Sequence, residues 1–116
     1  NYNDVYVQIF GYGDEDEKVL QTDTINGATE PEWNDQVFEF DESRDGVGVY
    51  RSFKFKLYDD DTVFGQDLFA DAFLGETDEF QVSVIVECDM DYSEEMTVYR
   101  DGSESGTLFV TISKQC

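Results

Sequence analysis

The sequence predicts an all-β protein, an antiparallel Greek-key β-sandwich of about seven to eight strands. Apolar and polar residues alternate with period two in several short segments, which is typical of strands with one buried face. Stretches rich in Gly, Asp and Asn separate most of these segments, and no segment shows a convincing helical period. Because a chain of 116 residues is long enough for a single core, we expect one domain over residues 1–116.

Seven segments carry the alternation, and we expect each of them to form one strand. The clearest is SFKFKLYD, in which Phe53, Phe55 and Leu57 alternate with Ser52, Lys54 and Lys56. The expected strands are residues 4–12, 18–25, 36–42, 52–59, 80–88, 96–100 and 106–113. The connections between them are long and acidic, and we expect residues 13–18 (GDEDEK) to form a solvated hairpin tip.

The charge balance excludes one class of partner. The chain has 28 acidic and seven basic residues, for a formal charge of −21. Nucleic acid phosphates would be repelled by such a surface, and an anionic membrane would not attract it by charge alone. Ten Phe, seven Tyr and one Trp supply enough apolar surface for a core, so an acidic disordered chain is not expected either.

Catalytic signals are missing from the sequence. Histidine is absent, which excludes Ser-His-Asp and Cys-His catalysis and removes the commonest zinc ligand. There is no Gly-rich phosphate loop and no serine elbow, and the carboxylates are too many to single out an acid–base pair. We therefore expect a binding protein rather than an enzyme.

The two cysteines, Cys88 and Cys116, are either a disulfide or two reduced thiols. We expect the disulfide, because a free thiol at the last residue would be exposed and reactive. A disulfide implies an oxidising compartment, hence a secreted or extracellular protein. No segment reaches the roughly 20 apolar residues that span a bilayer. Because the sequence begins with Asn1, we expect a processed chain or a fragment of a longer one.

Three consecutive aspartates, Asp59, Asp60 and Asp61, follow the strand at 52–59. Continued alternation would aim the first and third to one side, where two carboxylates repel each other unless a cation is present. Calcium accepts several carboxylate ligands in irregular geometry, whereas the alternative is a solvated acidic loop. An EF-hand is excluded, because Phe64 and Ala70 occupy the positions that require Gly and Glu.

The order of the motifs resembles the C2 domain, a calcium- and lipid-binding β-sandwich module. The resemblance rests on DVYVQIF, EPEWNDQVFEF, FKFKLYDDD, DAFLGE and GTLFVTI, taken in this order along nearly the whole chain. It implies calcium between loops at one end of the sandwich, held by Asp4, Asp59, Asp61 and Asp71. Asp60 and Asp67 are rival ligands, because the loop between Asp61 and Asp71 is longer than in most members.

The sequence departs from the family pattern at its beginning. The Asp expected a few residues before Asp4 is missing, and so is the opening strand before it. We expect a preceding segment or a neighbouring chain to supply that strand, unless the domain folds without it. We expect Trp33 to be a core or sandwich-edge anchor. Some family members bind phosphoinositide through a basic cluster on a sheet face, but two lysines, Lys54 and Lys56, against this much acid are read as a solvated face.

Four apolar residues, Val63, Phe64, Leu68 and Phe69, lie within the expanded acidic loop. In the family, such residues enter the lipid headgroup region once calcium neutralises the loops; the alternative is a small satellite core on the sandwich end. The leading hypothesis is therefore a calcium-dependent phospholipid-binding module, peripheral to a membrane or secreted. The alternatives are an extracellular calcium-binding protein-interaction or matrix module, and a calcium-independent scaffold.

Overall fold

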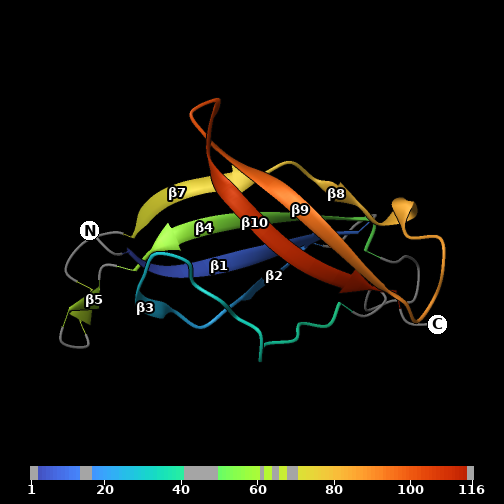
Figure 1. Cartoon of the computed structure of the whole chain (residues 1–116), viewed down its shortest axis with the longest axis horizontal. Coiled ribbons are helices and arrows are strands. Elements are labelled where there is room, and N and C mark those ends of the chain that lie inside the picture. Colours follow the sequence, from blue (N-terminus) through green and yellow to red (C-terminus); the bar gives the residue numbers. More distant parts are fainter. Residues whose placement is uncertain are drawn as a thin grey trace.

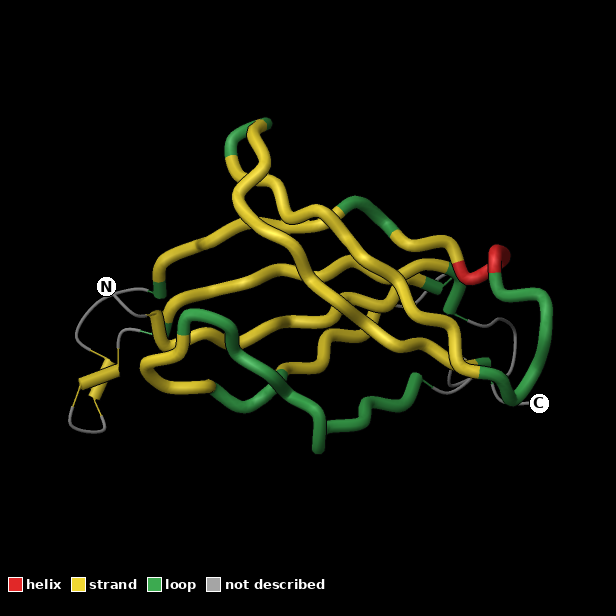
Figure 2. The backbone as a smooth tube through the Cα atoms, viewed as in Figure 1, coloured by secondary structure: helices red, strands yellow, loops and turns green. Residues whose placement is uncertain are grey.

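The computed structural model describes residues 3–13, 17–40, 50–60, 62–63, 66–67 and 71–114. Strands dominate this part of the chain, and one short 3-10 turn is its helical element (Figure 2). The elements are β1 (Asn3–Tyr12), β2 (Glu17–Gln21), β3 (Ile25–Ala28), β4 (Ser52–Asp59), β5 (Thr62–Val63), β6 (Gln66–Asp67), β7 (Ala72–Thr77), β8 (Phe80–Gln81), η1 (Val82–Val84), β9 (Asp91–Arg100) and β10 (Ser103–Ser113).

The main sheet is antiparallel, with strand order β10-β9-β7-β4-β1-β2. Two further strands extend it, since β3 pairs with β1 and β8 pairs with β4. The central pair is β1 with β4, whose register runs from Val5 opposite Asp59 to Tyr12 opposite Ser52. This register aligns the beginning of β1 with the end of β4, so residues at these positions share one end of the sheet.

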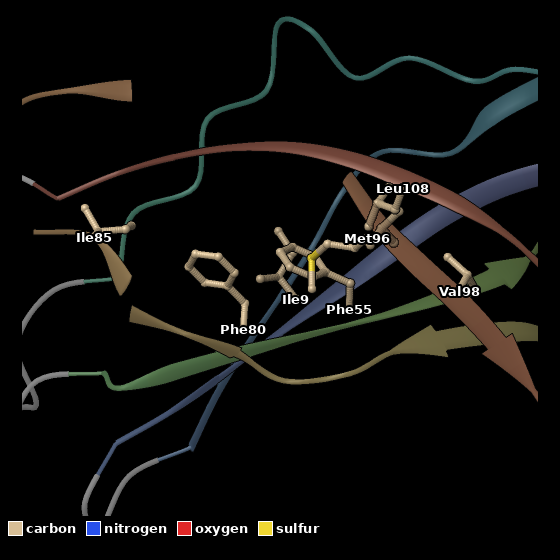
Figure 3. Packing of buried hydrophobic residues seen from close by; sticks show 8 residues of the cluster. Ile9, Phe55, Phe80, Ile85, Met96, Val98 and Leu108 are labelled. Carbon is tan, nitrogen blue, oxygen red and sulfur yellow. The ribbon is translucent and has the colours of Figure 1, made fainter. Parts of the chain in front are cut away.

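The sheet folds over itself into two layers, because the β9–β10 hairpin crosses obliquely over β1 and β4 (Figure 1). The apolar core lies between the layers, where Ile9 and Phe55 face Met96 and Leu108 (Figure 3). Its buried members are Val7, Ile9, Phe55, Phe80, Ile85, Met96, Val98 and Leu108. The predicted antiparallel β-sandwich is confirmed.

The segment predicted as one strand over residues 18–25 forms two, β2 and β3. The break falls at Thr22, a buried residue whose Oγ1 accepts a 2.9 Å hydrogen bond from the Val7 amide. The same hydroxyl donates to the Asp23 carbonyl at 3.0 Å. The threonine side chain thus replaces a ladder bond here, as short hydroxyl side chains do at turns.

Residues 36–42 were predicted to be a strand, and over the described part, 36–40, this is wrong. Phe38 and Phe40 pack against the core while Val37 and Glu39 face outward, but no described ladder includes them. The alternation here therefore indicates a segment with one buried side, although this segment pairs with no described strand. Trp33 also packs against the core and donates its Nε1–H to the Asp23 carbonyl at 2.8 Å, which confirms its expected role as an anchor.

The strand predicted over residues 80–88 is wrong beyond its first two residues. Phe80 and Gln81 pair with β4 as β8, and the chain then turns through η1, which the Ile85 amide closes on the Val82 carbonyl at 2.9 Å. Alternation in this segment misleads, because Val84 and Val86 are exposed.

Strand β7 was not predicted, although it begins within the DAFLGE motif, at Ala72. Its residues do not alternate clearly, and Gly75 adopts a φ of +147°, which interrupts a regular strand. Strands β9 and β10 are longer than predicted. Strand β9 begins at Asp91 instead of residue 96, and β10 begins at Ser103, directly after the turn at Asp101 and Gly102.

Cys88 is not a free thiol, and its expected partner Cys116 lies outside the described residues. The neighbouring backbone already joins the two regions, because the Asp89 amide donates to the Lys114 carbonyl at 2.7 Å. The pairing of Cys88 with Cys116 therefore stays a prediction that this contact supports.

Candidate functional site

Strand register gathers carboxylates at one end of the sandwich. Asp59 is the last residue of β4, and its partners on the two neighbouring strands are Val5 and Ala72. These partners adjoin Asp4 and Asp71 in the sequence, so three predicted metal ligands come from the same end of three adjacent strands. In Figure 1 this end is the one at which the described chain begins and from which β5 projects.

Asp60 joins the same group through two hydrogen bonds. Its amide donates to the Asp4 carbonyl at 2.7 Å, which extends the β1–β4 contact by one residue. Its carboxylate Oδ2 accepts a 3.1 Å bond from the Thr24 hydroxyl, in the segment between β2 and β3. Asp60 therefore joins the beginning of β1 to the segment between β2 and β3.

Backbone amides hold two of the carboxylates in place. The Asp4 amide donates to Asp59 Oδ1 at 2.9 Å, and the Gly27 amide donates to Asp4 Oδ1 at 2.7 Å. Gly27 has a φ of +63°, a left-handed conformation that favours glycine and turns its amide toward the carboxylate. These bonds offset part of the repulsion between acids that lie so close together.

A row of aromatic rings supports the fourth carboxylate. The Tyr6 hydroxyl donates a 2.5 Å hydrogen bond to Asp71 Oδ2. Tyr6 stacks on Tyr58 with ring centroids 5.4 Å apart, and Tyr58 contacts Phe73 at 5.6 Å, so the row crosses β1, β4 and β7. Burial, and then the bond to Asp71, raise the pKa of Tyr6 well above its usual value.

The acidic loop after β4 includes a small hairpin of β5 and β6, with Thr62 opposite Asp67 and Val63 opposite Gln66. In Figure 1, β5 of this hairpin projects beyond the end of β4, where Asp59 ends the strand. Asp61, Phe64, Leu68 and Phe69 lie outside the described residues.

The donor chemistry at this end fits a calcium ion, because Asp4, Asp59, Asp60 and Asp71 supply hard anionic oxygens from adjacent segments. Within the described part of the chain, no three acidic or thiol side chains are already close enough together to hold an ion. Each of the four carboxylates instead accepts a hydrogen bond from the protein. Binding an ion would therefore require at least some of these side chains to exchange a protein donor for the metal.

The contacts from Tyr6, Thr24 and Gly27 were not predicted from the sequence. Tyr6 is buried although its neighbours Val5 and Val7 are buried too, because the aromatic row covers Tyr6 near the end of the sheet. Thr24 and Gly27 belong to a segment whose pairing with β1 shifts register near the site. No spacing in the sequence signals such a shift.

The two lysines of β4 pair with an acid on the neighbouring strand. Lys54 and Lys56 place their Nζ atoms 3.2 and 3.9 Å from Glu76 carboxylate oxygens on β7. Lys56 also lies 4.6 Å from the centre of the Phe10 ring. These partners fit a solvated, ion-paired face rather than a basic cluster.

Comparison with known protein families shows to which family the chain belongs. A family model described as C2 domain matches residues 1–85, which is most of the chain. The chain belongs to the C2 domain family. The matched region includes all four carboxylates and the aromatic row beneath them. No curated protein and no solved structure matches the chain.

C2 domains are membrane- or calcium-binding modules and are typically not catalytic, so the family gives this domain a binding role. The C2 fold fits peripheral association with a membrane. Within the described residues, no helix is long and apolar enough to cross a bilayer.

Proposed function

We propose that this C2 domain binds phospholipid membranes in a calcium-dependent manner. The observation that supports the proposal is the register of Asp59 with Val5 and Ala72, which draws Asp4, Asp59 and Asp71 to one end of the sandwich. The acidic loop with its apolar residues leaves β4 at this same end.

Charge explains why calcium would be needed. A chain with a net charge of −21 is repelled by anionic lipid headgroups, most strongly where its carboxylates converge. Asp4, Asp59, Asp60 and Asp71 would hold the ion together with Asp61 and Asp67 of the loop. A bound calcium ion neutralises this end and supplies a positive centre for lipid phosphate oxygens, which are hard ligands of the kind it prefers.

The apolar residues of the loop would supply the second part of membrane affinity. Val63, Phe64, Leu68 and Phe69 are the residues that we propose to contact lipid. Burying an apolar side chain in the membrane contributes about 1.5–3 kcal/mol when burial is complete. Calcium would thus remove repulsion, and apolar contact would provide adhesion.

The hydrogen bonds of the carboxylates favour a second candidate, a calcium-independent C2 scaffold. Asp4 and Asp59 accept backbone amide bonds, and Asp60 and Asp71 accept hydroxyl bonds, so protein donors stabilise this end without a cation. If these hydrogen bonds persist in the presence of calcium, the four carboxylates stabilise the fold and do not bind the ion.

Co-sedimentation with vesicles of phosphatidylcholine and phosphatidylserine tests the proposal. We expect the domain to pellet with vesicles in calcium and to stay in the supernatant with a chelator. Asp59→Asn should abolish pelleting, whereas Asp91→Asn, an exposed aspartate at the start of β9, should not.

Three other outcomes would contradict the proposal in distinct ways. Equal pelleting with calcium and with chelator would indicate lipid binding that needs no calcium. Calcium binding by isothermal titration without pelleting would indicate a calcium-dependent protein-interaction or matrix module. Neither calcium nor vesicle binding would indicate the scaffold.

A further inference from the structure

Tyr6 lies on β1, which pairs with β4 on one side and with β2 and β3 on the other. It is 7% exposed, and the strand register places it opposite Tyr58, which in turn lies opposite Phe73 on β7. The rings of Tyr6 and Tyr58 stack at an interplanar angle of 17°. Packing against the neighbouring strand therefore fixes the direction in which the Tyr6 hydroxyl points.

Asp71 is placed differently, because it precedes β7 and lies outside the described strand ladders. Alternate residues of an extended chain point to the same face of a sheet, so Asp71 shares a face with Phe73 and with the ring of Tyr58 beside it. The Tyr6 hydroxyl reaches the Asp71 carboxylate on this face and donates to Oδ2 at 2.5 Å. This distance is typical of strong hydrogen bonds to an ionised carboxylate.

A neutral donor suits an acidic residue that also binds a cation. The tyrosine hydroxyl leaves the negative charge of the carboxylate in place, whereas a Lys or Arg partner would oppose the ion by its charge. A carboxylate has two oxygens and about four lone-pair sites, so it can accept one hydrogen bond and ligate calcium at the same time. Asp71 can therefore keep its bond to Tyr6 and still act as a ligand.

Breaking this bond is unfavourable, because Tyr6 is buried and stacked. A calcium ion that displaced its hydroxyl from Asp71 would leave a buried donor without a partner. The Gly27 amide, which donates to Asp4, is exposed and would regain a hydrogen bond to water instead. When the site binds an ion, Asp4 therefore exchanges its protein donor more readily than Asp71 does.

We propose that Tyr6 positions Asp71 for calcium: its buried hydroxyl holds the carboxylate in place and keeps this bond when the ion is bound. This role rests on the proposed calcium-dependent function, and it makes Tyr6 a residue that sets the calcium affinity of that site. Tyr6 does not contact the ion itself but acts through Asp71. If Tyr6 instead competed with calcium for Asp71, removing its hydroxyl would strengthen calcium binding.

Isothermal titration of the 116-residue chain with calcium tests this role. Metal-ligating side chains are usually hydrogen-bonded to outer partners, whose loss weakens metal binding about 10–100-fold. We expect Tyr6→Phe to weaken calcium binding at least about tenfold. Tyr92→Phe is the matched control, because it removes a hydroxyl that also bonds an acidic residue, Glu94, but lies on β9. Its calcium affinity should equal that of the unmodified chain.

Asp71→Asn decides whether Tyr6 acts through Asp71. This change should itself weaken calcium binding at least about tenfold, because it removes an anionic ligand. Adding Tyr6→Phe to Asp71→Asn should then cause little further loss, which is the coupling expected of two residues in contact. If Tyr6→Phe weakened binding by the same factor with and without Asp71, it would act by loosening this end of the sheet in general, and the proposal would be overturned.

A second measurement needs no variant and so does not depend on whether Tyr6→Phe folds. In the unmodified chain, the buried Tyr6 hydroxyl proton should give a hydrogen-bonded NMR signal both without and with saturating calcium. Loss of this signal in calcium, or tighter calcium binding by Tyr6→Phe, would show competition and overturn the proposal.

Two remaining outcomes separate this role from the function on which it rests. Calcium binding of equal strength by Tyr6→Phe and the unmodified chain would overturn the role of Tyr6 and leave the calcium site intact. Absence of calcium binding by the unmodified chain would overturn the proposed function, and the role of Tyr6 with it.

Discussion

The Tyr6 hydroxyl donates a 2.5 Å hydrogen bond to Asp71 Oδ2 and so connects β1 to the residue before β7, across β4. The tyrosine is 7% exposed and stacks on Tyr58. An acidic residue at the carboxylate-bearing end of the sandwich is thus bonded by a buried donor two strands away.

The first prediction is that Tyr6→Phe destabilises the fold. The change keeps the ring and its stacking but removes the bond to the Asp71 carboxylate, and bonds to charged groups contribute about 1.5–3 kcal/mol. We expect the free energy of unfolding, measured in urea, to fall by this amount. Tyr92→Phe is the control, because Tyr92 is exposed and bonds Glu94, and its midpoint should not change. Equal midpoints for the two variants would show that the Asp71 bond contributes nothing to stability.

The second prediction concerns Gly75 of β7. A Cβ at this position would lie 2.6 Å from Val98 Cγ1 and 2.9 Å from the Tyr99 carbonyl oxygen, and the φ of +147° is strained for other residues. Gly75→Ala should therefore lower the free energy of unfolding by at least about 2 kcal/mol.

Gly106 of β10 is the matched control for this substitution. A Cβ there would meet nothing within 4 Å, and its φ is not positive. Gly106→Ala should leave unfolding within about 0.5 kcal/mol of the original chain. If both alanines were tolerated alike in thermal and urea unfolding, the close approach of β7 to β9 would be wrong.

Side-chain alternation predicted the strands whose two faces differ in burial. It gave β4 its observed bounds, 52–59, because Phe55 faces the core while the lysines beside it face Glu76. It failed at 82–88, where Val84 and Val86 alternate like strand residues but lie in the open. Alternation describes the spacing of apolar residues and carries no information on whether a second layer covers them.

The candidate site was predicted from the resemblance rather than from spacing. Asp4, Asp59 and Asp71 were all assigned from the family motifs, and alternation located only the strand that Asp59 ends. Their proximity requires the β1–β4 and β4–β7 registers, which depend on contacts between residues far apart in the chain. The donor that Gly27 provides to Asp4 depends on a left-handed turn that its neighbours do not specify.

The third prediction is a disulfide between Cys88 and Cys116. The Asp89 amide bonds the Lys114 carbonyl at 2.7 Å, so the chain near each cysteine is already joined. An unstrained bridge that closes this loop contributes about 2–4 kcal/mol. Mass spectrometry after alkylation without reductant should find no modified thiol, and reduction should lower the melting temperature. Two alkylated cysteines in the unreduced protein would contradict the bridge.

The fourth prediction tests the ligand set directly. Asp59→Asn or Asp61→Asn should weaken calcium binding at least tenfold, or about 1.4 kcal/mol, because each removes an anionic oxygen ligand. Lys54→Ala should leave the affinity unchanged, since its side chain pairs with Glu76 instead. Isothermal titration gives the three dissociation constants. If all three match that of the unmodified domain, calcium does not bind at this loop.

The last prediction separates a specific ion site from general relief of charge repulsion. A charge of −21 opposes the compact state, so any salt should raise the melting temperature by screening. In about 1 M potassium chloride the Debye length is about 3 Å, and diffuse repulsion is already screened. Calcium that binds only the folded state still adds about 2.7 kcal/mol at a hundredfold excess over Kd.

For a chain of this size, that gain corresponds to a rise on the order of 10 °C. Millimolar calcium in high salt should therefore raise the midpoint by several degrees in calorimetry. Magnesium should raise it much less, because it requires a smaller octahedral shell and releases its waters reluctantly. The specific site would be contradicted if calcium and magnesium raise the melting temperature equally, or if neither raises it in high salt. The acidic end of the sandwich would then be solvated, and the hydrogen bonds of Asp4, Asp59, Asp60 and Asp71 would stabilise it without an ion.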